Sequence, residues 1–397
     1  MLREELVKIV ESQETYFDRE VNILDRNLTA LIRTDINAAI IITGVRRSGK
    51  STLLRKIYRT KKIPTGYLHF DDPRLISFQV DDFYKLEEIW KDKEVLQFDE
   101  IHKVPNWELY VRQRVERKLK ISITGSNAHL MSSEMGTYLT GRHLTYELFP
   151  FSFKEYSTYF KLEQNLNSLN AYISDGGFPE AVIAKEPSLH AALLVDIIEK
   201  DIVVRKGLRN NVEIQKLALH LINNISRPFS FRKLANFFDI SVKAVIDYIA
   251  YLEDVYLFFV VSKFDYSYKK QLNNPKKIYA IDHAFARFNS LQFSQDAGRV
   301  LENMVFIELR KKTKQVFYFE QNTECDFVTN QLNQGLQCFQ VSILVTGENR
   351  DREVNGLLGA LDFFKLDTGY IITLNQEDVI KIQNKIIHLI PFWKWAG

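Results

Sequence analysis

The stretch that decides the fold reads Gly44-Val45-Arg46-Arg47-Ser48-Gly49-Lys50-Ser51-Thr52. It contains the pattern G-x-x-x-x-G-K-[ST], whose glycines let backbone N–H groups curl around phosphate groups. The apolar run Ala38–Thr43 precedes this stretch as a buried strand, and Ser51–Tyr58 follows it with the pattern of a helix. Strand, loop and helix in this order predict a phosphate-binding loop at the N-terminus of a helix.

The ligand expected at Gly44–Thr52 is ATP with Mg²⁺. Lys50 would reach the β- and γ-phosphates, and the hydroxyl of Ser51 would ligate the metal. Arg46 and Arg47 either contact phosphate or face solvent, and the sequence does not choose between these positions. No residue pattern in the chain reads the adenine base, so the choice of ATP rests on the loop alone.

A second near-apolar strand, Val95–Phe98, ends in the carboxylates Asp99 and Glu100. Asp99 would hold Mg²⁺ through water, and Glu100 would orient and deprotonate the attacking water. The alternative is a solvated acidic pair at the start of a helix. The pair follows the phosphate loop by about fifty residues, which favours the metal site over that alternative. The glutamate directly after the metal-binding aspartate favours hydrolysis of a nucleoside triphosphate over a kinase reaction.

A third strand candidate, Ile121–Thr124, is followed by Gly125, Ser126 and Asn127. A polar side chain at this place would lie between the γ-phosphate and the attacking water. Ser126 or Asn127 is therefore a candidate sensor, and the alternative is an N-cap for the next helix.

Further strand and helix candidates predict the fold class of this region. The strand candidate Tyr67–Phe70 lies between the loop helix and the acidic pair, an insertion typical of the additional-strand class of P-loop ATPases. Helical patterns cover Asp82–Trp90 and Trp107–Leu119. Short apolar strands that alternate with helices predict an α/β fold with a parallel sheet covered on both faces.

Ordered blocks along most of the chain resemble the bacterial and archaeal ATPases of the AAA superfamily that carry a C-terminal domain of unknown function. The resemblance covers the chain from about Phe17 to Trp395. It rests on ITGVRRSGKSTLL, YLHFDDPRL, VLQFDEIHKVPNW, ITGSNAHLM, LTGRHLTYELFPFSFKEY, ISDGGFPEAV, KKIYAIDHAF and GRVLENMVFIELR.

The resemblance implies a role for Arg142, which makes it a candidate arginine finger or second sensor. An arginine on the γ-phosphate stabilises the charge of the transition state, and such fingers raise rates by ~10³–10⁵. In related ATPases this arginine often acts across a subunit interface, which would require self-association. The alternative is a helix-end arginine that pairs with a carboxylate such as Glu147.

The middle of the chain has the layout of a winged helix. A first helix, Phe231–Phe238, is followed by a second, Val242–Leu252, with Ser241 as its N-cap, and Val255–Phe264 would form the wing. Lys200–Ile278 carries a net +7, which favours an anionic partner such as DNA. The second helix itself is acidic, so a structural role against a neighbouring element remains the alternative.

The C-terminal region has the order of a PD-(D/E)xK nuclease. Glu302 lies on a predicted helix, Asp326 starts a strand, and Gln340 lies on a later strand followed by Val341 and Ser342. The last position is normally E-x-K, but an amide is a poor Mg²⁺ ligand and serine cannot replace an ammonium. We therefore expect a small restriction-endonuclease-like fold that has lost its activity.

Length and composition set the limits of these interpretations. The chain has 397 residues with 46% hydrophobic residues and a net charge of +3, which is ordinary for a folded protein of two to three domains. Only Cys325 and Cys338 occur, so we expect core thiols in a reducing, cytoplasmic compartment. No apolar run approaches the ~18 residues of a membrane span. The expected domains are 1–155, 156–275 and 276–397.

These patterns leave three functional hypotheses. The first is Mg²⁺-dependent ATP hydrolysis that drives a conformational switch, with DNA, a protein partner or a second copy of the chain as the element acted on. The second is a DNA-binding regulatory or scaffold protein with a slow ATPase, in which residues 200–278 hold the DNA. The third is a metal-dependent nuclease coupled to the ATPase.

Overall fold

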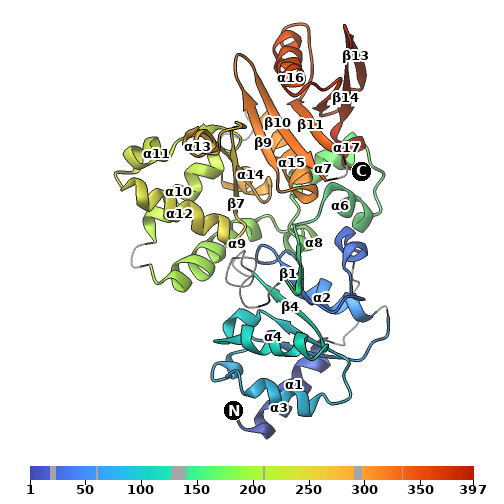
Figure 1. Ribbon diagram of the computed structural model, residues 1–397, viewed down its shortest axis with the longest axis vertical. Coiled ribbons are helices and arrows are strands. Elements are labelled where there is room, and N and C mark those ends of the chain that lie inside the picture. Colours follow the sequence, from blue (N-terminus) through green and yellow to red (C-terminus); the bar gives the residue numbers. More distant parts are fainter. Residues whose placement is uncertain are drawn as a thin grey trace. The chain divides into compact units, whose positions relative to one another are not determined.

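The computed structural model describes residues 1–17, 24–59, 61–126, 139, 141–208, 211–289, 297–332 and 334–397. The chain divides into two units, Met1–Phe149 and Pro150–Gly397 (Figure 1). The first unit ends close to the boundary expected at residue 155. The regions expected at 156–275 and 276–397 both lie in the second unit.

The first unit is built on a five-stranded sheet in the order β2-β3-β4-β1-β5, and every neighbouring pair is parallel. The parallel sheet expected from the sequence is confirmed. The segment Tyr67–Phe70, which suggested an additional strand between the loop and the acidic pair, forms the edge strand β2. In the sheet itself, the strand that lies between β1 and β3 is β4. The strands are β1 (Ala39–Thr43), β2 (Thr65–His69), β3 (Val95–Asp99), β4 (Lys120–Gly125) and β5 (His143–Glu147).

Both faces of this sheet are buried. Ile41 belongs to one apolar cluster, while its neighbours Ile40 and Ile42 belong to a second cluster, because successive strand residues point to opposite faces. The covering helices are α1 (Arg3–Phe17), α2 (Lys50–Arg59), α3 (Asp82–Ile89) and α4 (Trp107–Glu116), with short 3₁₀ turns at Asn27–Leu31, Pro73–Leu75 and Ile101–Lys103.

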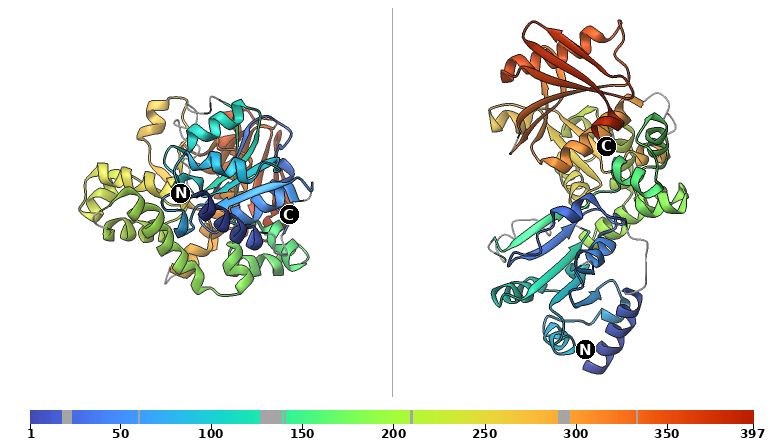
Figure 2. Two further views of the ribbon diagram at one scale, coloured as in Figure 1. Left: turned by 90° about the horizontal axis from the view of Figure 1, so that it is seen from below. Right: turned by 90° about the vertical axis from the view of Figure 1, so that its right-hand side faces the viewer.

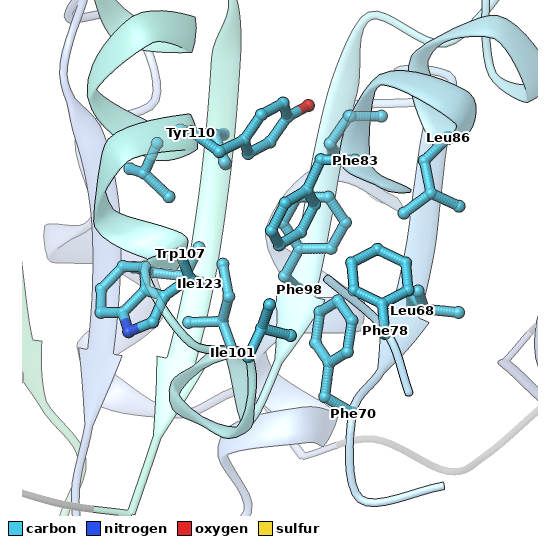
Figure 3. Close-up of a cluster of buried hydrophobic side chains, with 14 of the residues drawn as sticks. Leu68, Phe70, Phe78, Phe83, Leu86, Phe98, Ile101, Trp107, Tyr110 and Ile123 are labelled. Atoms are coloured by element: carbon cyan, nitrogen blue, oxygen red, sulfur yellow. The ribbon is translucent and has the colours of Figure 1, made fainter. Parts of the chain in front are cut away.

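Aromatic rings fill the cluster that contains Ile41 (Figure 3). Phe83 of α3 stacks on Tyr110 of α4 with ring centroids 4.3 Å apart, and Phe98 of β3 packs against Phe83 at 5.1 Å. Such pairs add to the stabilisation that apolar burial already provides. They hold the residues of β3 firmly under the two helices, so the strand that ends at Asp99 has a fixed position.

The second unit begins with a helical region and a small three-stranded sheet. The sheet order is β6-β8-β7, with both pairs antiparallel. Because β8 begins at Lys276, the expected domain boundary at 275/276 falls between β7 and β8 of this sheet. The elements are α6 (Phe153–Phe160), α7 (Leu166–Asp175), α8 (Pro179–Ala184), α9 (Ser188–Asp196), a π-helix (Ile197–Val204), α10 (Val212–Asn223), β6 (Pro228–Phe229), α11 (Phe231–Phe238), α12 (Val242–Asp254), β7 (Phe258–Ser262), α13 (Tyr268–Asn273), β8 (Lys276–Ala280) and α14 (Ala284–Asn289).

The rest of the second unit is a mixed six-stranded sheet in the order β13-β14-β12-β11-β10-β9. Val328 packs in the cluster with α16, whereas its neighbour Phe327 contacts Phe306 of α15, so the two helices cover opposite faces (Figure 2). The sequence patterns missed β13, β14 and α17. The elements are α15 (Ala297–Lys312), β9 (Val316–Glu320), β10 (Glu324–Gln331), β11 (Gly335–Ser342), α16 (Arg350–Phe364), β12 (Thr368–Thr373), β13 (Asp378–Ile382), β14 (Lys385–Pro391) and α17 (Phe392–Trp395).

The cap of α12 and the two cysteines are placed as the sequence predicts. Ser241 caps α12, because its hydroxyl accepts a hydrogen bond from the Ala244 N–H at 3.0 Å. Cys325 and Cys338 are both buried in the cluster under α16, as expected for core residues. Among the described residues, no helix has the length and apolar character that a membrane span requires.

Candidate nucleotide-binding site

The candidate site lies where β1, β3 and β4 end. Thr43 of β1 pairs with Gly125 of β4, and Phe98 of β3 pairs with Ile123 of the same strand. Because parallel strands end at one edge of a sheet, the loop after β1, the acidic pair after β3 and Ser126 after β4 meet there.

Gly44 must be a glycine for two reasons. Its φ is +148°, a conformation that side chains rarely adopt, and a Cβ at this position would lie 2.2 Å from the carbonyl oxygen of Leu148. Gly49 also has a positive φ, +95°. The glycines of the motif therefore shape the loop, as the sequence pattern requires.

Arg26 forms a hydrogen bond with the backbone of the phosphate loop, although no sequence motif indicated this residue. Its guanidinium donates to the carbonyl of Ser48 at 2.9 Å and to the carbonyl of Phe149 at 2.6 Å, and the residue is buried. A buried guanidinium with fixed carbonyl partners ties the loop at Ser48 to the backbone that follows β5. The residue lies 22 positions before Ser48, so only the folded chain brings the two together.

Lys50 is buried at the first position of α2 and points back into the loop. Its ammonium donates to the carbonyls of Gly44 and Val45, each at 3.1 Å, and lies 3.8 Å from Glu100 Oε1. Ser51 and Thr52 are exposed in the first turn of the helix, while Arg46 and Arg47 are half-buried. The ammonium is therefore held by carbonyl groups that a phosphate oxygen can replace.

Asp99 is completely buried and fixed from two sides. The hydroxyl of Thr124 donates to its Oδ1, and the hydroxyl of Tyr67 donates to its Oδ2 at 2.9 Å. Burial, together with the neighbouring charge of Asp99, raises the pKa of Tyr67 above its ordinary value, so this hydroxyl keeps its proton. His69 approaches the same oxygen to 4.0 Å.

Glu100 follows in a left-handed conformation with φ +53°. Its backbone N–H donates to the Thr124 hydroxyl at 3.1 Å, so this hydroxyl links both members of the acidic pair. Its Oε2 accepts from the backbone N–H of Ser126 at 3.3 Å and lies 3.3 Å from His102 Nδ1. The carboxylate thus faces Lys50 on one side and Ser126 with His102 on the other.

These residues fit ATP and Mg²⁺. Ser51 offers an exposed hydroxyl beside Lys50, and Asp99 offers a carboxylate whose oxygens already accept protein hydrogen bonds, which suits a metal contact through water. Of the two sensor candidates, Ser126 contacts Glu100 through its N–H and hydroxyl, whereas Asn127 lies outside the described residues.

Arg142 lies beside the N-terminal ends of β1 and β5, whereas the candidate site lies at the C-terminal ends of the strands. It precedes β5, and its carbonyl accepts from the N–H of Ala39 at the beginning of β1. Glu147 lies at the far end of β5, beside Thr43. Five strand residues span about 16 Å, so the suggested pair with Glu147 is wrong, and Arg142 does not reach the phosphate loop of its own chain.

The three nuclease-like residues are brought together in the second unit. The backbone N–H of Asp326 donates to Gln340 Oε1 at 3.2 Å, and the ammonium of Lys277 lies 3.1 Å from Glu302 and 3.5 Å from Asp326. The sequence patterns missed Lys277, because it lies on β8, before the segment with the nuclease-like order.

The net +7 of residues 200–278 is partly balanced inside the fold. Lys200, Lys206, Lys263 and Lys277 pair with carboxylates, and most of those carboxylates lie outside this segment. The exposed face of α12 presents the apolar side chains Val242 and Ile246. These four lysines therefore contribute less to attraction of an anionic partner than the net charge of the segment suggests.

Comparison with known proteins places these features in a family. The AAA domain matches residues 37–157, and a domain of unknown function (DUF8612) matches residues 166–296. "Uncharacterized protein MJ1544" from Methanocaldococcus jannaschii is 34% identical over 414 residues, which cover 95% of this chain and 92% of the relative. An uncharacterized protein from Haemophilus influenzae is 28% identical, covering 86% of this chain and 92% of its own.

The chain is weakly similar to two solved structures of other proteins. AMPPCP-bound DnaA from Aquifex aeolicus has a TM-score of 0.29 and 14% identity, covering 63% of this chain and 86% of DnaA. The RuvB Holliday junction branch migration motor from Thermotoga maritima has a TM-score of 0.29 and 15% identity, covering 65% of this chain and 88% of RuvB.

The parallel sheet, the phosphate loop and the matched domain define the first unit as an AAA-type P-loop domain. The chain as a whole belongs to the family that includes MJ1544 of Methanocaldococcus jannaschii.

Thr124 provides a test of the acidic pair. We expect Thr124→Val to lower ATP turnover by about tenfold to a hundredfold, because Asp99 and Glu100 both lose their shared partner, while nucleotide binding changes little. Turnover and nucleotide affinity are measured on the same protein. Ser122→Ala is the control, since Ser122 lies on the same strand and bonds Tyr58 instead. An equal loss in both variants would assign the effect to strand packing.

Proposed function

We propose that the first unit binds ATP with Mg²⁺ at Gly44–Thr52 and hydrolyses it. The observation that carries this proposal is the meeting of Lys50, Asp99, Glu100 and Ser126 at one edge of the sheet. Mg²⁺ bound with the nucleotide would supply neutralisation of the phosphate charge.

The protein's own groups divide the work of the reaction. Lys50 exchanges its carbonyl partners for phosphate oxygens, and Asp99 would hold Mg²⁺ through water. Glu100, 3.8 Å from Lys50, then loses that counter-charge to the phosphates and is free to accept a proton from the attacking water. Ser126, which donates to Glu100, reports whether the γ-phosphate is present. A change in the contact between Ser126 and Glu100 is the expected start of a conformational switch.

The two steps are separable by mutation. We expect Lys50→Ala to abolish ATP binding, and Glu100→Gln to retain binding while turnover falls about a hundredfold or more. Equilibrium binding of a fluorescent ATP analogue and phosphate release are the measurements. Glu94→Gln is the matched control, because Glu94 lies exposed just before β3, at the other end of the same strand from Glu100. Normal turnover in Glu100→Gln would exclude Glu100 as the base.

We propose that Arg142 acts on the nucleotide of a second copy of the chain. It lies at the end of β5 that is distant from its own phosphate loop, so it does not contact the nucleotide bound by its own copy. Its side chain is exposed. Together with Arg112 and Glu116 it lines a shallow hollow on the surface of the first unit. An arginine at such a place serves a neighbouring γ-phosphate only in an assembly.

A mixing experiment tests this role. We expect Arg142→Ala to lower turnover by about a thousandfold without loss of ATP binding. Mixing it with Lys50→Ala should restore turnover, because one partner supplies the intact loop and the other the arginine. Arg112→Ala is the control, since Arg112 lines the same hollow but pairs with Glu116 at 2.9 Å. Absence of any recovery in the mixture contradicts the role between copies.

A second function, DNA binding, is favoured by one specific surface. The order α10-β6-α11-α12-β7-α13-β8, with its antiparallel sheet, has the layout of a winged helix, and α13 lies in the wing between β7 and β8. Tyr266 and Tyr268 are 80% and 73% exposed, next to the exposed Lys269 and Lys270. Lysines bind phosphates and exposed aromatic rings stack on bases, so the wing fits DNA better than α12 does.

The wing is tested by charge reversal. We expect the full chain to bind DNA more weakly as salt rises, and the double variant Lys269→Glu/Lys270→Glu to lose at least about tenfold in affinity with a salt slope smaller by about two. Lys243→Glu on α12 is the control and should bind normally. Absence of DNA binding by the full chain at low salt would exclude this second function.

A further inference from the structure

The residues with the nuclease-like order surround a buried lysine. The ammonium of Lys277 lies 2.7 Å from Glu324 Oε1, 3.1 Å from Glu302 Oε1 and 3.5 Å from Asp326 Oδ1, and its side chain is only 3% exposed. The three carboxylates come from two separate elements, α15 and β10, while the lysine comes from β8 of the small sheet.

Several other polar atoms of this cluster also have protein partners. The hydroxyl of Tyr279 donates to Glu302 Oε1 at 2.7 Å, and the backbone N–H of Val341 donates to Asp326 Oδ2 at 2.9 Å. Gln340 accepts from the Asp326 N–H and donates to Glu353 Oε2 at 2.8 Å. Gln340 therefore ties the end of β10 to α16 and offers no free oxygen to a metal.

We propose that the ammonium of Lys277 is the built-in cation of this cluster and takes the place that a divalent metal has in nucleases with this residue order. The second unit is then held together by an internal ion cluster, and it neither needs nor binds a metal there. The nuclease alternative fails at this point, because the carboxylates that would hold the metal already surround the lysine.

Charge and burial explain why Lys277 remains protonated and in place among the carboxylates. Burial raises the pKa of Glu302 and raises the pKa of Asp326 to about 8, so these two carboxylates need a cation beside them to stay ionised. Glu324 is 45% exposed and keeps contact with solvent. Burial alone would lower the pKa of Lys277, but the acidic groups around it raise that pKa well above its ordinary value. The lysine therefore keeps its charge, and it lies on a strand that cannot withdraw without breaking the β7–β8 pairing.

The proposal predicts that the cation can be exchanged by mutation. Lys277→Met in the full, nucleotide-free chain should unfold about 10 °C below the parent protein, and millimolar Mn²⁺ should recover several degrees of that loss. The parent protein and the exposed control Lys269→Met should show no such response to Mn²⁺. Thermal unfolding with and without Mn²⁺ is the measurement, supported by Mn²⁺ binding followed by electron paramagnetic resonance.

Removal of the opposing charges provides the second arm. The triple variant Lys277→Met/Glu302→Gln/Asp326→Asn should regain stability without metal, because the lysine and both buried carboxylates lose their charges while Glu324 stays in contact with solvent, and it should lose the Mn²⁺ response. If Lys277→Met does not fold, recovery of folding in the triple variant still supports the proposal.

Three results on stability and metal binding would overturn the proposal. The first is Mn²⁺ binding by the parent protein that Asp326→Asn abolishes, since the carboxylates would then be free for a metal. The second is a Lys277→Met protein as stable as the parent, and the third is a triple variant as unstable as Lys277→Met. DNA cleavage by the parent that is lost in Asp326→Asn would also overturn it, because cleavage at this cluster requires a bound metal.

Discussion

The candidate site depends on one constraint, the parallel pairing of β4 with both β1 and β3. Parallel strands end at one edge, so the pairing brings the phosphate loop, the acidic pair and Ser126 together. The pairing also places Thr124 of β4 beside the acidic pair that follows β3. Its hydroxyl donates to Asp99 and accepts from the N–H of Glu100. Burial of both faces secures the register, since a slip of one residue would turn Ile41 into the wrong apolar cluster.

Two buried lysines show how different partners give different behaviour. Lys50 rests on two carbonyl oxygens with one carboxylate 3.8 Å away, so an incoming phosphate offers it a stronger partner. Lys277 lies within 3.5 Å of three carboxylates, and no single ligand matches that arrangement. The first ammonium is therefore available for ligand binding, while the second serves the fold. Both residues are almost completely buried, so burial alone does not distinguish them.

Local patterns were sufficient for the parts of the site that follow one another in the chain. The G-x-x-x-x-G-K-[ST] loop needs its strand before it and its helix after it, and Asp99 with Glu100 needs only the apolar strand that ends there. Arg26, Tyr67 and Thr124 carry no such signal, because each acts through a hydrogen bond to a residue distant in sequence. The net charge of residues 200–278 has the same limit as a local signal, since carboxylates elsewhere in the chain balance several of its lysines.

The sequence by itself determined the class of the first unit, its phosphate loop, its acidic pair and the order of Glu302, Asp326 and Gln340, because these follow from short patterns and strand periodicity. Only the tertiary structure decided that Arg142 lies far from its own loop and that Lys277 sits among the carboxylates. The physical reason is strand direction and pairing: which end of β5 faces the nucleotide, and which strand places a side chain against α15, depend on hydrogen bonds between segments far apart in the chain.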